Sequence, residues 1–97
     1  MEIKTIKKLE IGDKESFTKT VSEHDVYSFA GVTGDTNPVH INHEFAKGTV
    51  FGKRIAHGIL AVGFISTVLG TKLPGPGSIY VNQNCQFVKP VFIGDTI

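Results

Sequence analysis

The sequence has very little cysteine and hardly any net charge, and each shortage excludes a class of protein. Cys85 is the only cysteine in 97 residues, so no intrachain disulfide can form and a reducing compartment, the cytoplasm, is expected. The formal net charge of +1 gives no reason to expect nucleic acid or a membrane surface as a partner. Residues 1–10 carry lysines but lack the apolar run of a secretory signal. Length and composition fit one small globular domain, residues 1–97.

Charged side chains are also missing from residues 55–71, which contain no Lys, Arg, Asp or Glu. From Ile59 to Leu69 only three residues are not apolar, namely Gly63, Ser66 and Thr67. A helix that is apolar nearly all round is buried on nearly all sides, so we expect a central helix with a sheet wrapped around it. A membrane span needs about 20 apolar residues. This run is shorter and contains His57, which disfavours that alternative.

Two further helices are predicted from their capping residues. Ser22 is a favourable N-cap, and the acidic residues Glu23 and Asp25 would complement the dipole of the helix that follows. We expect Gly31 and Gly34 to end this helix. A second, short helical piece is expected where Asn42 can cap the residues through Phe45 and Ala46.

Two segments alternate as β-strands do. Residues 16–21 predict a short strand, and residues 78–88 predict a longer strand with one face on the core. That core face would hold Ile79, Val81, Cys85 and Phe87, which makes Cys85 a small buried hydrophobe rather than a nucleophile. Similar turns are expected at residues 11–13 and 93–95, both Ile-Gly-Asp.

Asp35 and His40 form the clearest candidate for chemistry. Asn37 and Pro38 lie between them, and Pro38 prevents a continuous helix, so the loop can direct both side chains toward one point. A free aspartate is a weak base. Burial would strengthen it, and a histidine could orient a shared water and carry a proton. The alternative is an aspartate in an Asx turn and a histidine on the surface.

Other polar residues allow two interpretations each. The Gly58 N–H, at the start of the apolar helix, could bind a developing oxyanion; alternatively, His57 is a satisfied buried histidine and Gly58 a packing residue. Ser66 could face a ligand tunnel or bond to a carbonyl of the preceding turn. No metal site is expected, because His40 and His43 have no third ligand at a clear spacing. No phosphate-binding glycine motif is present.

Four stretches, taken together, resemble the MaoC-like family of (R)-specific enoyl-CoA hydratases. Residues 29–40 (FAGVTGDTNPVH) resemble its hydratase 2 motif, and residues 51–60 (FGKRIAHGIL) resemble its next block. Residues 73–80 (LPGPGSIY) and 87–95 (FVKPVFIGD) are similar to later turns and strands of the family. The four matches occur in the family's order and cover nearly the whole chain.

The resemblance implies an α+β hot-dog fold, in which a curved antiparallel sheet wraps around a long central helix. It also implies a lyase of fatty-acid metabolism that hydrates trans-2-enoyl-CoA to (R)-3-hydroxyacyl-CoA, reversibly and without a cofactor. By this resemblance, Asp35 and His40 hold the water, the Gly58 N–H binds the thioester oxygen and Asn37 stabilises the loop. Ser66 corresponds to a position near the acyl pocket. Acyl-CoA would be the substrate, and a homodimer or higher homo-oligomer the assembly.

The resemblance departs from the family after Gly94 and Asp95, where family members continue with further strands. We therefore expect the last strands of the sheet to be missing and the central helix to be partly uncovered. Two alternatives to the hydratase remain: an acyl-thioester-binding or assembly module with little turnover, and a hot-dog thioesterase. The latter is disfavoured because the motif Asp-Thr-Asn-Pro-Val-His is a hydratase pattern.

Overall fold

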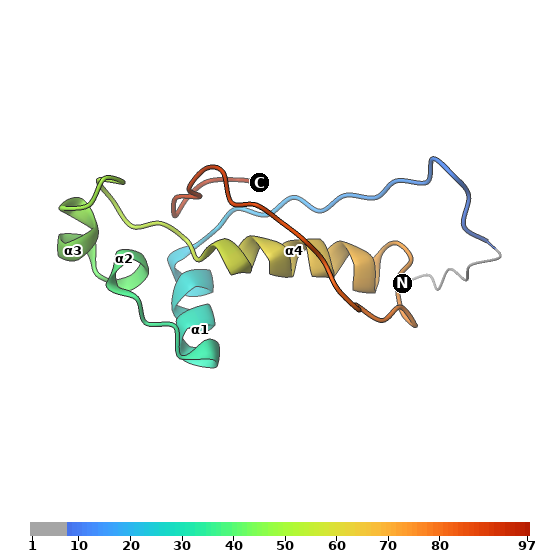
Figure 1. Ribbon diagram of the computed structural model, residues 1–97, viewed down its shortest axis with the longest axis horizontal. Coiled ribbons are helices and arrows are strands. Elements are labelled where there is room, and N and C mark those ends of the chain that lie inside the picture. Colours follow the sequence, from blue (N-terminus) through green and yellow to red (C-terminus); the bar gives the residue numbers. More distant parts are fainter. Residues whose placement is uncertain (1–7) are drawn as a thin grey trace. The chain divides into compact units, whose positions relative to one another are not determined.

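The computed structural model describes residues 8–97, which form four helices (Figure 1). The helices are α1 (Glu23–Thr33), α2 (Pro38–Ile41), α3 (His43–Lys47) and α4 (Gly58–Thr71). The chain divides into a first unit, residues 61–85 with the segment up to Phe17, and a second unit, Thr18–Leu60 with Gln86–Ile97. None of the helices in residues 8–97 is long and apolar enough to cross a membrane. Residues 1–7, and with them most of the N-terminal segment in which no secretory signal is expected, lie outside the described residues.

The predicted capping residues of α1 and α3 are confirmed. Ser22 forms a capping box with Asp25: the Asp25 N–H donates to Ser22 Oγ (3.1 Å) and the Ser22 N–H donates to Asp25 Oδ2 (2.9 Å). Gly34, in the left-handed conformation at φ 80°, ends α1, whereas Gly31 lies inside the helix. Asn42 caps α3 by accepting from the N–H of Phe45 at 3.0 Å. These ends follow from local chemistry and were therefore readable from the sequence.

Helix α2 was not predicted, because we took Pro38 as the end of helical structure. Pro38 is instead the first residue of α2, where its missing N–H costs nothing because a first-turn N–H has no intrahelical partner. Asn37 caps this helix, since its Oδ1 accepts from the N–H of Val39 at 3.2 Å.

The predicted strands are only partly confirmed. In residues 8–97 the extended segments form just two isolated antiparallel bridges, Thr20 with Thr96 and Ile55 with Phe92. The alternation in residues 16–21 holds, because Val21 is 1% exposed whereas Thr20 faces solvent. The prediction of a core face on residues 78–88 is wrong: all eleven residues are exposed, including Cys85. Within the described residues no second strand pairs with this segment, so its apolar side is left largely uncovered.

The predicted burial of the apolar helix is also wrong for this chain. No residue of α4 is buried, and Ile59 and Ile65 are each about half exposed (52% and 50%). The reason is the shortage of strands, because covering such a helix requires a sheet that residues 8–97 do not build. The partly uncovered helix expected from the sequence is thus observed. The largest fully buried side chains of the described residues, Val21 and Val26, lie in the second unit.

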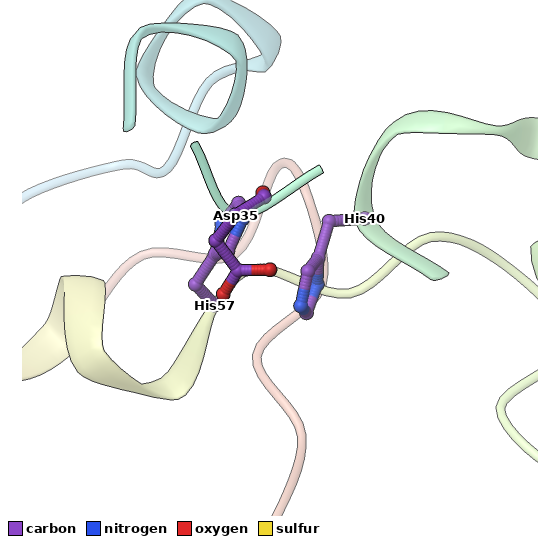
Figure 2. Close-up of side chains that lie close together, drawn as sticks. All are labelled: Asp35, His40 and His57. Carbon is purple, nitrogen blue, oxygen red and sulfur yellow. Dashed lines mark hydrogen bonds between the residues drawn. The ribbon is translucent and has the colours of Figure 1, made fainter. Parts of the chain in front are cut away.

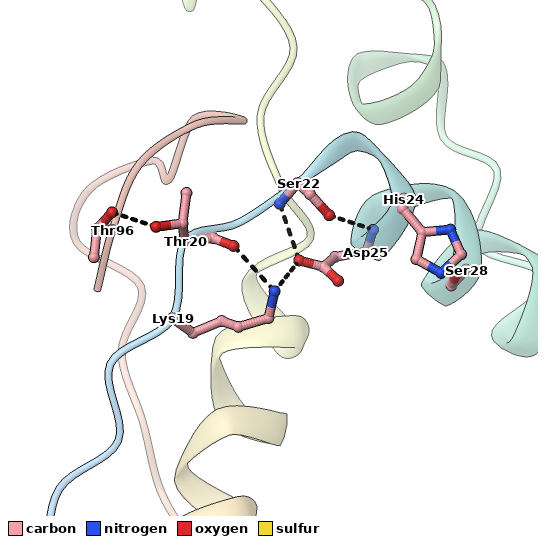
Figure 3. A network of polar contacts seen from close by, with 7 residues as sticks. All are labelled: Lys19, Thr20, Ser22, His24, Asp25, Ser28 and Thr96. Atoms are coloured by element: carbon pink, nitrogen blue, oxygen red, sulfur yellow. Dashed lines mark hydrogen bonds and ion pairs between the residues drawn. The ribbon is translucent and has the colours of Figure 1, made fainter.

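A polar network fixes the entry to α1 (Figure 3). The Lys19 ammonium group lies 2.6 Å from Asp25 Oδ2 and donates to the Thr20 carbonyl at 3.0 Å, while the hydroxyls of Thr20 and Thr96 are hydrogen-bonded at 2.6 Å. The hydrogen bond from Lys19 and the backbone N–H of Ser22 hold the pKa of the Asp25 carboxyl below its ordinary value. The network joins the segment before α1 to the C-terminal residues.

Replacing Asp25 by Asn should lower the free energy of unfolding at pH 7 by about 1 kcal/mol. The substitution removes the negative charge that accepts the Ser22 N–H in the capping box and pairs with Lys19. A carboxyl with a lowered pKa in the folded state stabilises the fold above its unfolded pKa, and this stabilisation is lost as the pH falls through the folded pKa. The difference between variant and wild type should therefore shrink below about pH 4. Urea unfolding at pH 7 and pH 3 measures it; equal destabilisation at both values would contradict the charge-based explanation.

Candidate active site

His40 has a defined position and tautomer. It lies on α2, is 8% exposed, and its Nδ1 is 2.7 Å from the carbonyl oxygen of Ile55. A carbonyl can only accept a hydrogen bond, so Nδ1 carries the proton in this contact. In the neutral ring Nε2 is then unprotonated and free to accept a hydrogen bond from a water. The prediction of His40 as a surface histidine is therefore excluded.

Asp35 lies in the loop between α1 and α2, and its carboxylate is turned toward the His40 ring (Figure 2). Its Oδ1 accepts from the N–H of Asn37 at 3.4 Å, and its N–H donates to Thr33 Oγ1 at 3.1 Å, so the Asx-turn interpretation is also correct. The expected burial of Asp35 is wrong, because this short loop holds the residue at the surface of the second unit.

The third member of the group is His57. One potential ligand atom of each of Asp35, His40 and His57 lies within 4.8 Å of the other two. No hydrogen bond joins the three side chains to one another in the described chain (Figure 2). Polar atoms no more than 4.8 Å apart can be joined through a bridging water.

His57 is buried as predicted but is not fully satisfied. It is 3% exposed, and its Nε2 donates to the main-chain oxygen of Asp35 at 2.9 Å. Its ring lies against those of His40 (centroids 3.9 Å apart, planes at 32°) and Phe29 (4.6 Å, 48°). Its Nδ1 is buried and has no hydrogen-bond partner among residues 8–97. Sequence reasoning assigned His57 no functional role; the available signal was its place directly before Gly58.

Gly58 is the first residue of α4, where the N–H groups of the first turn have no intrahelical partner. A Cβ built on Gly58 would lie 2.9 Å from Cδ1 of Phe87, so glycine permits the close approach of this ring. The packing interpretation of Gly58 is therefore supported, and the position of its N–H in the first turn of α4 is compatible with the oxyanion-binding interpretation.

Arg54 joins the segment before His57 to α1. Its guanidinium donates to the hydroxyl of Tyr27 at 2.7 Å and is also paired with Glu23. The Glu23 carboxylate raises the pKa of Arg54 above its ordinary value. These contacts hold the chain that leads to His57 and Gly58.

Asp35, Asn37, His40 and Gly58 all belong to the second unit, and Ser66 belongs to the first. Ser66 is exposed on α4 and lines a pocket of about 410 Å³. Leu69, Pro74 and Tyr80 also line this pocket. Ser66 therefore faces a space that a ligand could occupy. This agrees with the interpretation in which Ser66 lines a ligand tunnel.

The three-residue group does not have the geometry of a metal site. Ring nitrogens bind a metal along lone pairs in the ring plane, at about 2.0–2.1 Å for zinc. Rings stacked 3.9 Å apart at only 32° have planes that meet well beyond that distance, so His40 and His57 cannot bind one ion without rotating. His43, the other histidine considered as a ligand, is exposed on α3.

Comparison with known proteins matches residues 7–97 to the MaoC-like domain. The chain belongs to this family. An (R)-specific enoyl-CoA hydratase of Rhodospirillum rubrum is 60% identical over 89% of the chain and 60% of its own length. A 3-hydroxybutyryl-CoA dehydratase of Methylorubrum extorquens is 52% identical over 92% of the chain and 57% of its own length. The chain thus spans about three fifths of these curated relatives.

Solved structures of the family share the fold. An R-hydratase from Pseudomonas aeruginosa superposes with a TM-score of 0.88 at 46% identity, covering 93% of this chain and 58% of that one. An (R)-hydratase from Aeromonas caviae gives 0.87 at 42% identity, covering 91% and 67%. These similarities confirm the hot-dog fold that the resemblance predicted.

Proposed function

We propose that the protein catalyses the (R)-specific hydration of trans-2-enoyl-CoA to (R)-3-hydroxyacyl-CoA and its reverse. The observation that carries the proposal is the Asp35 carboxylate turned toward His40, whose Nε2 is the unprotonated nitrogen (Figure 2). A carboxylate and an unprotonated Nε2 are both acceptors, and a water has two hydrogens to donate. One water can thus donate to both groups and keep its lone pairs for the substrate.

The reaction needs only water and proton transfer. The water oxygen attacks C3, the C2–C3 π electrons move onto the thioester, and the Asp35–His40 pair accepts a proton from the water. The enolate oxygen formed is stabilised by the Gly58 N–H at the start of α4, where the helix dipole is positive. The pair then returns the proton to C2 on the face that water attacked. Asn37 stabilises the loop by capping α2, and no cofactor takes part.

The surroundings of this site are part of the proposal. A curved antiparallel sheet wraps around α4 in the assembled protein, which is a homodimer or higher homo-oligomer in the cytoplasm. The pocket at Ser66 accepts the acyl chain and contributes to chain-length preference. Thioesters of CoA and of acyl-carrier protein present the same reacting atoms, and the relatives' names include enzymes acting on each.

Incubation with crotonyl-CoA tests the proposal, with enoyl-thioester absorbance and free thiol followed side by side. Loss of absorbance without thiol release, giving the (R)-3-hydroxy product, is the expected result. Thiol release would identify a thioesterase instead. Binding without turnover, from a folded sample, would identify a thioester-binding or assembly module. The sequence of Asp35 through His40 favours the first outcome.

A further inference from the structure

We propose that His57 is a positioning residue for the hydration: it holds Asp35 and His40 in the arrangement that shares one water. This inference rests on the proposed function. His57 need not touch the substrate, because its contacts are with the two groups that hold the water.

The first contact fixes the Asp35 loop. Of the described hydrogen bonds of Asp35, only the one from His57 Nε2 to its main-chain oxygen (2.9 Å) reaches beyond its own loop. The others join it to Thr33 and Asn37, two residues away on either side. Because Asp35 is exposed, this bond from a buried side chain is the described hydrogen bond that ties the main chain at Asp35 to the segment before α4.

The second contact restrains the His40 ring. The His57 ring lies against the rings of both Phe29 and His40, and the His40 ring is held at its Nδ1 edge by the Ile55 carbonyl. With one edge bonded and one face covered, the His40 ring cannot rotate away from the water without breaking a contact.

The third observation is the buried Nδ1 of His57, which has no hydrogen-bond partner in the part of the chain that the structure describes. Buried polar groups are nearly always hydrogen-bonded, so an unpaired one needs an explanation. An apolar side chain would fill the same space without that cost, but it could not donate to Asp35. The donor at Nε2 explains why a histidine lies here. Directly after it comes Gly58, so His57 also links the water-binding loop to the N–H that receives the enolate oxygen.

Two variants separate the donor from the ring. His57→Phe keeps a stacked ring and loses the donor, whereas His57→Gln keeps an N–H donor and loses the ring. With crotonyl-CoA, we expect His57→Phe to lower kcat about 10- to 100-fold with little change in KM, because misplaced groups slow chemistry more than binding. His57→Gln should recover a large part of this loss. His24→Gln, at an exposed histidine on α1, is the matched control and should match wild type.

Rates are compared per folded molecule, with the folded fraction taken from thermal unfolding, so that a purely structural role lowers stability without lowering kcat. Wild-type kcat in His57→Phe, or equal losses in His57→Phe and His57→Gln, would overturn the inference.

Nitrogen NMR of the imidazoles tests the arrangement without any activity. The structure places the proton of neutral His40 on Nδ1 and that of neutral His57 on Nε2, so the two stacked rings should be opposite tautomers. The same tautomer in both rings would overturn the inference. A wild-type chain without turnover would instead overturn the proposed hydratase, and the spectra would then decide the His57 geometry independently.

Discussion

Asp35→Asn is expected to lower kcat for crotonyl-CoA hydration by about 10³-fold, within the range of general acid–base catalysis. Asparagine keeps the size of the side chain, and its Oδ1 can still accept from the Asn37 N–H that now reaches Asp35 at 3.4 Å. What disappears is the negative charge and the second acceptor that the water needs. The KM should change little, because the carboxylate acts on water rather than on the CoA group.

Glu44→Gln is the matched control, since it removes one exposed carboxylate from α3, a helix that does not contain the pair. It should retain wild-type kcat and KM. If Asp35→Asn kept more than about a tenth of the activity, the loss would be too small for removal of a general base, and Asp35 would have to be reassigned as a loop-forming residue.

The Asp35→Asn/His40→Gln double variant should be hardly slower than the slower of the two single variants. Groups that act as one unit on one water lose the unit's whole contribution when either is removed, so their effects do not add. His40→Gln is chosen because Gln is polar and fits a site that is 8% exposed, although it cannot reproduce both ring nitrogens. Initial rates of the four proteins at saturating crotonyl-CoA complete the cycle.

Additive losses, each single variant multiplying the other's effect, would mean that Asp35 and His40 act on different steps or different molecules. Such a result would leave the hydratase activity intact while removing the shared water from its mechanism. Binding of the product, measured separately for each variant, guards against a collapsed site.

The parts of the fold that were predicted correctly depend on short stretches of sequence. Ser22 and Asn42 cap their helices through atoms three residues away, and Gly34 ends α1 through its own left-handed conformation. The Gly94 turn likewise has a positive φ of 99°. Pro38 misled us, because a missing N–H can either stop a helix or start one, and the sequence does not distinguish these outcomes.

The incorrect predictions depend on partners distant in the sequence. The alternation in residues 78–88 and the apolarity of α4 show that these segments can pack against a partner. They do not show whether residues 8–97 supply that partner. The role of His57 was missed for a similar reason: its bond to Asp35 spans 22 residues. Asp35 and His40 were recognisable because a short loop joins them and because a family motif contains both.

The stereochemistry of hydration in D₂O tests the central claim, that one water between Asp35 and His40 supplies both the oxygen and the proton. Crotonyl-CoA is hydrated in D₂O, and the relative configuration at C2 and C3 of the product is read from its proton NMR couplings. The shared water predicts a single deuteron at C2, on the same face as the new C3 oxygen. A deuteron on the opposite face, or an equal mixture of the two, would contradict the shared water.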